Sequence, residues 1–262
     1  MILPASYSNG FAPRDGSPLY PELWRGCVGA WAPCLGPTGL NLMDWSGAKR
    51  HAPLVNMAAS NAWILRDRRY ALNCPDSDDR ITITAANSGP IYDRGTGDFA
   101  IAMHMSAEAG SYRGVFGNMT TFGNGIILGR NTTNWGGYLG NSTELNSGHA
   151  IPTDGSWHQY GVQRSGSTVS WWVDGKQTST THTNSNSLAG TSATTWGFCN
   201  GYSLWPGGVD DLRIYSVPLS SRQWITLATR RGIAYELAPR RRSAESIAAF
   251  NRRRRLLLGA QS

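Results

Sequence analysis

Short runs in which apolar and polar positions alternate recur through the middle of this chain and predict many β-strands. In residues 99–105, large side chains alternate with small ones, as in a half-buried strand. Asp174-Gly175 separates two strand-like runs, and Asp-Gly is a strong signal for a tight hairpin. We expect strands at 62–66, 69–73, 80–84, 99–105, 113–117, 125–129, 157–164, 168–173, 195–201 and 208–215. Antiparallel strands separated by frequent turns favour a sandwich or a barrel.

One helix is expected after the strands, at residues 221–230. Ser220 and Gln223 have the spacing of a capping box, and Trp224 and Leu227 place an apolar stripe on one side. Gly232 is a candidate C-terminal stop.

Composition separates the two ends of the chain from this central block. Residues 1–22 contain four prolines and show little periodicity, which predicts an extended N-terminal arm. Residues 23–232 form the expected sandwich domain, and residues 233–262 form an arginine-rich tail for docking. The first residues resemble no signal peptide, and no apolar run approaches the roughly 20 residues of a membrane span. We therefore expect synthesis in a cytoplasm and no membrane insertion.

The four cysteines, Cys27, Cys34, Cys74 and Cys199, lack CxxC spacing and histidine neighbours, which argues against a zinc site. Buried free thiols are the simplest interpretation, and a Cys27–Cys34 bridge is the alternative.

Several motifs, read in order, resemble the laminin-G-like branch of the concanavalin-A-like lectin/glucanase superfamily, as found in tailed-bacteriophage virion proteins. They are Asp44-Trp45-Ser46-Gly47 with His51, Gly97-Asp98-Phe99, Asp154-Gly155-Ser156-Trp157-His158, Trp172-Val173-Asp174-Gly175 and Gly208–Tyr215 followed by Pro218-Leu219-Ser220. The resemblance spans residues 24–231. It implies an all-β fold, a two-sheet antiparallel jelly-roll sandwich, and it leaves the function open because this fold hosts many functions.

The acidic residues argue against an enzyme. A retaining glycosidase needs two carboxyl groups about 5 Å apart. None of the five glutamates has an acidic residue two or four positions away, and the cluster of Asp76, Asp78 and Asp79 lies in a proline-containing turn. We expect no catalytic residues.

Two glycine-rich aromatic stretches are candidates for glycan binding, because sugar rings stack on aromatic side chains while polar groups hold their hydroxyls. The candidate residues are Trp135, Tyr138, Asn200, Tyr202 and Trp205. The alternative is that these rings pack in the core or against another subunit.

The family resemblance also implies a structural calcium ion near Asp210, and an ordinary hydrogen-bonding aspartate is the alternative. No other cofactor is expected.

The tail contains two arginine runs, and the chain has only two lysines, Lys49 and Lys176. Arginine without lysine suits carboxylate partners across a protein interface and disfavours nucleic acid. The residues expected to dock are Arg240, Arg241, Arg242, Phe250, Arg252, Arg253, Arg254 and Arg255.

Together these patterns predict a non-catalytic, lectin-like structural protein of a bacteriophage particle, decorating the capsid or forming part of the tail. It would contact other virion proteins through its terminal arms, oligomerise with itself in the assembly and touch host glycans. The alternative is a bacterial glycan-binding or adhesion module, and a glycoside hydrolase ranks third.

Overall fold

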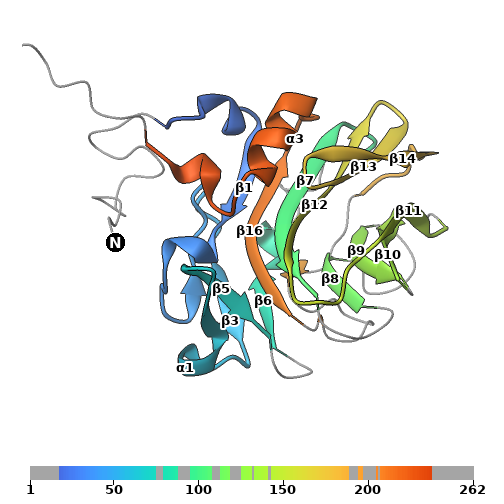
Figure 1. Cartoon of the computed structure of the whole chain (residues 1–262). Coiled ribbons are helices and arrows are strands. Elements are labelled where there is room, and N and C mark those ends of the chain that lie inside the picture. Colours follow the sequence, from blue (N-terminus) through green and yellow to red (C-terminus); the bar gives the residue numbers. More distant parts are fainter. Residues whose placement is uncertain are drawn as a thin grey trace, which may run out of the picture.

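Two antiparallel β-sheets stack face to face in the computed structural model of the chain (Figure 1). The structure describes residues 18–74, 79–87, 95–107, 113–118, 125–131, 133–140, 143–188, 194–196, 205 and 207–237, and the account below concerns these residues. No helix among them is long and apolar enough to cross a membrane.

The first sheet has the strand order β14-β13-β12-β7-β16-β5-β4, and β1 also pairs with β16. Its strands are β1 (Cys27–Trp31), β4 (Trp63–Arg66), β5 (Arg69–Asn73), β7 (Phe99–Ser106), β12 (Trp157–Ser165), β13 (Thr168–Val173), β14 (Lys176–Thr183) and β16 (Gly208–Tyr215). The central strands β7 and β16 are fully buried, because one face packs on the other sheet and the opposite face lies under a helical layer.

The second sheet has the order β11-β10-β9-β8-β15-β6-β3-β2. Its strands are β2 (Asn41–Leu42), β3 (Ala52–Val55), β6 (Arg80–Ile83), β8 (Arg113–Gly117), β9 (Ile126–Asn131), β10 (Asn134–Leu139), β11 (Leu145–Ala150) and β15 (Thr194–Trp196). Helix α1 (Ala59–Ala62) precedes β4.

The main core lies between the sheets, and a second, smaller core lies on the outer face of the first sheet. In the second core, α3 (Ser221–Ala228) and the 3-10 turns η1 (Pro21–Leu23) and η3 (Ile233–Tyr235) cover alternate residues of the strands. The rings of Trp172 on β13 and Trp224 on α3 stack there at 5.2 Å. Leu23 and Ile233 are buried in this same cluster. The predicted domain boundaries after residues 22 and 232 therefore fall inside a packed layer.

The predicted all-β sandwich with one short helix is confirmed. Strands β5, β8, β13 and β16 have the predicted bounds, and the Ser220–Gln223 capping box forms as predicted. Gly232 does not end the helix, since α3 stops at Ala228 and Gly232 instead precedes η3. Six strands were not predicted: β1, β2, β3, β10, β11 and β14. Strand β14, for example, is polar along its whole length, so its sequence has no apolar alternation.

The described cysteines Cys27, Cys34 and Cys74 are free thiols, so the Cys27–Cys34 bridge is absent. Burial raises the pKa of the Cys27 thiol to about 11, which keeps it protonated and unreactive at neutral pH.

Candidate functional site

Trp135, one of the predicted glycan contacts, lies in the core between the sheets. Its side chain is 0% exposed, and its indole N–H donates to the carbonyl oxygen of Gly161 at 3.1 Å. The rings of Tyr160 and Trp171 lie 5.4 and 5.9 Å away. The predicted glycan contact at Trp135 is therefore wrong, because Asn134–Leu139 forms strand β10 and Trp135 is buried in the core. A ring so enclosed cannot stack on a sugar.

Trp205 is also fully buried, and its indole N–H donates to the carbonyl oxygen of Ser106 at 2.9 Å. It therefore packs in the core, as the alternative interpretation had it. Tyr138 is partly buried on β10, with its hydroxyl 3.5 Å from a carboxylate oxygen of Glu144. Its role as a glycan contact stays a prediction. The candidates Asn200 and Tyr202 lie outside the described residues.

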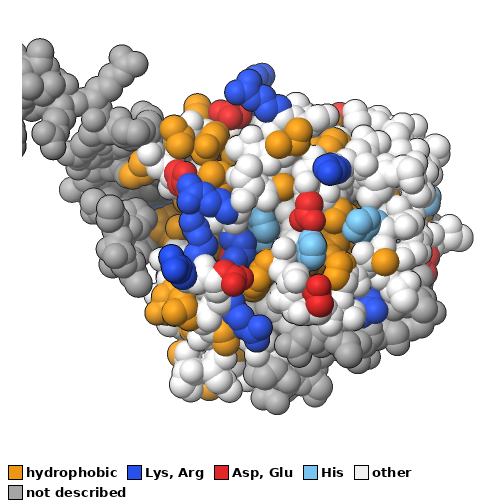
Figure 2. All heavy atoms as spheres, viewed as in Figure 1, with side chains coloured by type: hydrophobic (Ala, Val, Ile, Leu, Met, Phe, Trp, Pro, Cys, Tyr) orange, Lys and Arg blue, Asp and Glu red, His pale blue; other side chains and the backbone are white. Residues whose placement is uncertain are grey.

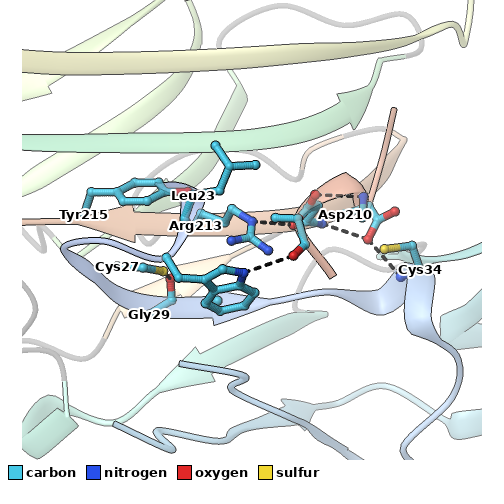
Figure 3. A network of polar contacts seen from close by, with 12 residues as sticks. Leu23, Cys27, Gly29, Cys34, Asp210, Arg213 and Tyr215 are labelled. Atoms are coloured by element: carbon cyan, nitrogen blue, oxygen red, sulfur yellow. Dashed lines mark hydrogen bonds and ion pairs between the residues drawn. The ribbon is translucent and has the colours of Figure 1, made fainter. Parts of the chain in front are cut away.

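Asp210, the predicted calcium ligand, belongs to a buried network at the bulge of β16 (Figure 3). Its Oδ1 accepts the backbone N–H groups of Cys34 and Asp211, and its Oδ2 lies 3.3 Å from Nη1 of Arg231. The neighbouring Asp211 accepts from Nε of Arg213 at 3.0 Å and from the N–H of Gly232 at 2.8 Å. Each carboxylate has an arginine partner.

These residues do not fit a calcium ion. Calcium takes six to eight oxygen ligands. Both oxygens of Asp210 already accept from protein donors, and no group of three His, Cys, Asp or Glu among the described residues could hold a metal. The contacts match the alternative interpretation, an ordinary hydrogen-bonding aspartate.

Arg213 fastens both ends of the described chain to the sandwich. Its guanidinium is fully buried between two rings, 4.5 Å from the centroid of Trp24 and 4.4 Å from that of Tyr235. Beyond this contact, Leu19 donates its N–H to the carbonyl oxygen of Glu236, and Pro18 pairs with Leu237. The two terminal segments therefore lie side by side (Figure 1). The predicted docking residues from Arg240 to Arg255 lie outside the described residues.

A second polar contact joins β12 to the turn between β13 and β14. Nδ1 of His158 on β12 is 2.7 Å from Oδ2 of Asp174 in the β13–β14 turn. In the view of Figure 2, histidine and acidic side chains lie near one another toward the middle of the face, beside basic side chains. Oδ1 of Asp174 also accepts the N–H of Gln159, so this carboxylate holds the turn against β12. The pair is explained by this structural role.

The described part of the chain has an open pocket of about 620 Å³ between η1 and the start of α3. Pockets of 300–1,000 Å³ are typical of small-molecule sites. Its lining combines two apolar side chains with charged and polar ones: Glu22, Arg25, Val217, Pro218, Ser220, Arg222 and Gln223. Sequence reasoning missed this site, because its two walls are about 200 residues apart in the chain and the capping box of the second wall indicates only the start of a helix.

Both walls of the pocket are anchored to the end of β16. The hydroxyl of Tyr215 donates to the carbonyl oxygen of Leu23, and the N–H of Ser216 donates to that of Gly26 at 2.8 Å. Gly26 has a φ of 71°, and a Cβ atom there would lie 2.6 Å from Cγ2 of Val217. Only glycine permits this close approach. The amide of Gln223 joins the two walls by donating to the carbonyl oxygen of Glu22 at 2.7 Å.

Solved structures of similar fold cover most of the chain at low sequence identity. One is domain 4 of AbnA, a GH43 extracellular arabinanase from Geobacillus stearothermophilus, solved in complex with arabinotriose. Its TM-score is 0.58 at 15% identity, and the alignment covers 78% of this chain and 98% of that domain. Trypanosoma rangeli sialidase has a TM-score of 0.54 at 14% identity, covering 78% of this chain but 32% of the sialidase. At this identity the likeness shows the fold alone.

A third similar structure is that of botulinum neurotoxin type C, which interacts with two ganglioside molecules. Its TM-score is 0.58 at 12% identity, with 79% of this chain and 52% of that chain covered. The chain thus spans about a third of the sialidase and half of the toxin structure. No curated protein sequence matches this chain.

The family model of the concanavalin A-like lectin/glucanases superfamily matches residues 75–223, which is more than half of the chain. That range runs from the segment before β6 to the start of α3, so it contains most strands of both sheets. Motifs, sheet topology and family model agree, and this protein belongs to the concanavalin A-like lectin/glucanases superfamily.

Proposed function

We propose that this protein is a non-catalytic, lectin-like component of a bacteriophage particle that binds a glycan in the pocket between η1 and α3. The observation that carries the proposal is the pocket itself. Its backbone is held by hydrogen bonds to β16, it has the volume of a small-ligand site, and it combines two apolar side chains with several polar groups. A rigid site loses little conformational freedom when it binds.

The arrangement of the acidic residues supports a non-catalytic function. Among the described residues, Glu22 is the single carboxylate that lines the pocket, whereas glycoside hydrolysis by the usual mechanism needs a pair. The carboxylates Asp210 and Asp211 are buried and do not line the pocket, so neither can reach a ligand bound there.

The arrangement of the two termini supports the role in an assembly. Because Pro18 pairs with Leu237, the N-terminal arm and the arginine-rich tail start at neighbouring points. Two segments that start together can contact one partner surface, and the arginines of the tail suit an acidic protein there. In this proposal the partners are other virion proteins, the chain oligomerises within the particle, and glycans are met on the host surface.

A glycan array probed with the full chain tests the binding part. Val217 lines the pocket and is 40% exposed, so Val217→Trp should fill the pocket without disturbing the core and abolish array signals. Ile225→Trp is the matched control, because Ile225 is an exposed residue of α3 that does not line the pocket. An array without signals for the wild-type chain would contradict glycan binding.

Copurification tests the assembly part. A virion component should be present in purified phage particles in stoichiometric amounts. Its absence from particles, together with glycan binding, would instead favour a bacterial adhesion module. Turnover of a glycan panel that is lost on changing one acidic residue would contradict the non-catalytic part.

A further inference from the structure

We infer that the glycan held in this pocket is anionic, a sugar with a carboxylate or a phosphate group, and that Arg25 and Arg222 recognise the charge. This inference rests on the proposed glycan-binding function and names its ligand class. The polar groups of the pocket differ in whether they are already used by contacts within the protein.

The capping box uses the uncharged polar groups of the lining. Ser220 Oγ accepts the N–H of Gln223 at 3.3 Å. Gln223 Oε1 accepts from both the N–H and the hydroxyl of Ser220, each at 2.9 Å, and its Nε2 donates to Glu22. The helix N-terminus is therefore already capped from within the protein. The charged side chains of the lining therefore remain for ligand recognition.

Arg25 and Arg222 are the two cationic groups among the described residues of the lining, and neither forms an ion pair. The ion pairs formed by the described residues are His158–Asp174, Arg213–Asp211, Arg230–Glu236 and Arg231–Asp210. Neither pocket arginine belongs to them, and both side chains are exposed to solvent. Glu22 is the one carboxylate among the described lining residues, which therefore carry an excess of one positive charge. A preformed, positively charged concavity favours an anion.

The two arginines approach the pocket from opposite walls. Arg25 follows η1 and precedes Gly26, and Arg222 lies in the first turn of α3. Guanidinium groups donate in a planar fork that matches carboxylate and phosphate oxygens. Between them, Val217 and Pro218 offer an apolar surface to the C–H face of a sugar ring, while the carboxylate of Glu22 can accept hydrogen bonds from hydroxyl groups. The lining thus has a counterpart for each part of an acidic monosaccharide.

Calorimetric titration of the full chain provides the test, with glucuronic acid, glucose 6-phosphate and glucose as probes and with free acetate and inorganic phosphate as controls. Arg25→Gln and Arg222→Gln should each weaken binding of the acidic sugars about tenfold, as expected for the loss of a charge-assisted hydrogen bond. Arg68→Gln, the same change at an exposed arginine of the β4–β5 turn, should leave binding unchanged. Binding to the wild type should weaken as salt rises.

The outcomes separate this inference from the function beneath it. Two results would show that the chain binds glycans but that the inference of an anionic ligand is wrong. One is an affinity for glucose equal to that for the acidic sugars, and the other is a wild-type affinity for acidic sugars in both pocket variants. If no sugar binds, the proposed function fails and the inference with it. A preference for glucuronic acid over glucose 6-phosphate would identify the carboxylate as the recognised group, and the reverse would identify the phosphate. Tight binding of acetate or phosphate alone would show an anion site without sugar recognition and overturn the inference.

Discussion

Arg231 Nη1 lies 3.3 Å from Oδ2 of Asp210, and both side chains are almost completely buried on the outer face of the first sheet. Nη2 of Arg231 also donates to the carbonyl oxygen of Arg66, and its guanidinium stacks 4.1 Å above the ring of Trp157. A single arginine thus joins β16, β4 and β12 to the segment after α3. Its removal would leave a carboxylate buried without its counter-charge.

We expect Arg231→Met to lower the free energy of unfolding by about 3–5 kcal/mol, the usual cost of breaking a buried ion pair from one side. Urea denaturation measures this. The adjacent Arg230→Met is the control, because Arg230 pairs with Glu236 at the surface, where such pairs contribute less than about 1 kcal/mol. Equal losses for the two variants would contradict the importance given to the buried pair.

Calcium should not stabilise this protein, because the oxygens of Asp210 are occupied by protein donors. An ion bound only by the native state would raise the melting temperature with its concentration. We therefore expect the same Tm in calcium chloride and in a chelator. A Tm that rises steadily with calcium would show a site elsewhere in the chain.

Stability should depend on pH through His104, which is 5% exposed on β7. Burial lowers its pKa to about 4, whereas an unfolded histidine titrates near 6.5. Between these pH values the unfolded chain binds a proton that the native chain does not. Neutral His104 therefore contributes at most about 3 kcal/mol to the free energy of unfolding, and this contribution is lost as pH falls from 6.5 to 4.

Asp210 acts in the opposite direction, because burial raises its pKa to about 7, above that of an unfolded aspartate. Its contribution to stability therefore grows as pH falls from 7 to 4. The difference between wild type and His104→Gln, measured by urea denaturation at pH 7 and pH 5, isolates the histidine. The variant should lose less stability than the wild type on acidification, and parallel losses would contradict the assignment.

Trp135→Phe should affect stability and leave glycan binding unchanged. The smaller ring gives up the hydrogen bond to Gly161 and leaves a cavity between the sheets, for which we expect a loss of about 2–4 kcal/mol. Thermal or urea unfolding and the glycan array measure the two effects. Loss of array signals in a variant that remains folded would show that Trp135 contributes to glycan binding.

Deletion of residues 240–262 should leave the sandwich folded, because both cores are formed by residues that end at Ala234. The melting temperature should hardly change, while incorporation into the parent particle is lost. Normal incorporation of the truncated chain would contradict docking by the arginine tail. Incorporation that depended on viral DNA would favour nucleic acid as its partner.

Local sequence was sufficient where a structural feature depends on neighbouring residues. Asp174 and Gly175 adopt φ angles of 47° and 73°, which a tight hairpin turn requires and which this dipeptide tolerates. The capping box at Ser220 depends on a spacing of three residues and formed as predicted. The strand Thr168–Val173 was recognisable because its run of apolar residues ends at the turn signal Asp174-Gly175.

The tertiary structure alone decided the function of residues whose neighbours are distant in sequence. Asn134-Trp135-Gly136-Gly137 has the composition of a loop, and it became a strand because β9 and β11 pair with it on both sides. Arg25 and Arg222 are unremarkable as sequence, and β1 pairing with β16 carries them to the two walls of one pocket. Alternation and capping are short-range effects of backbone geometry, whereas a pocket forms where long-range strand pairing ends, and no local pattern encodes that meeting.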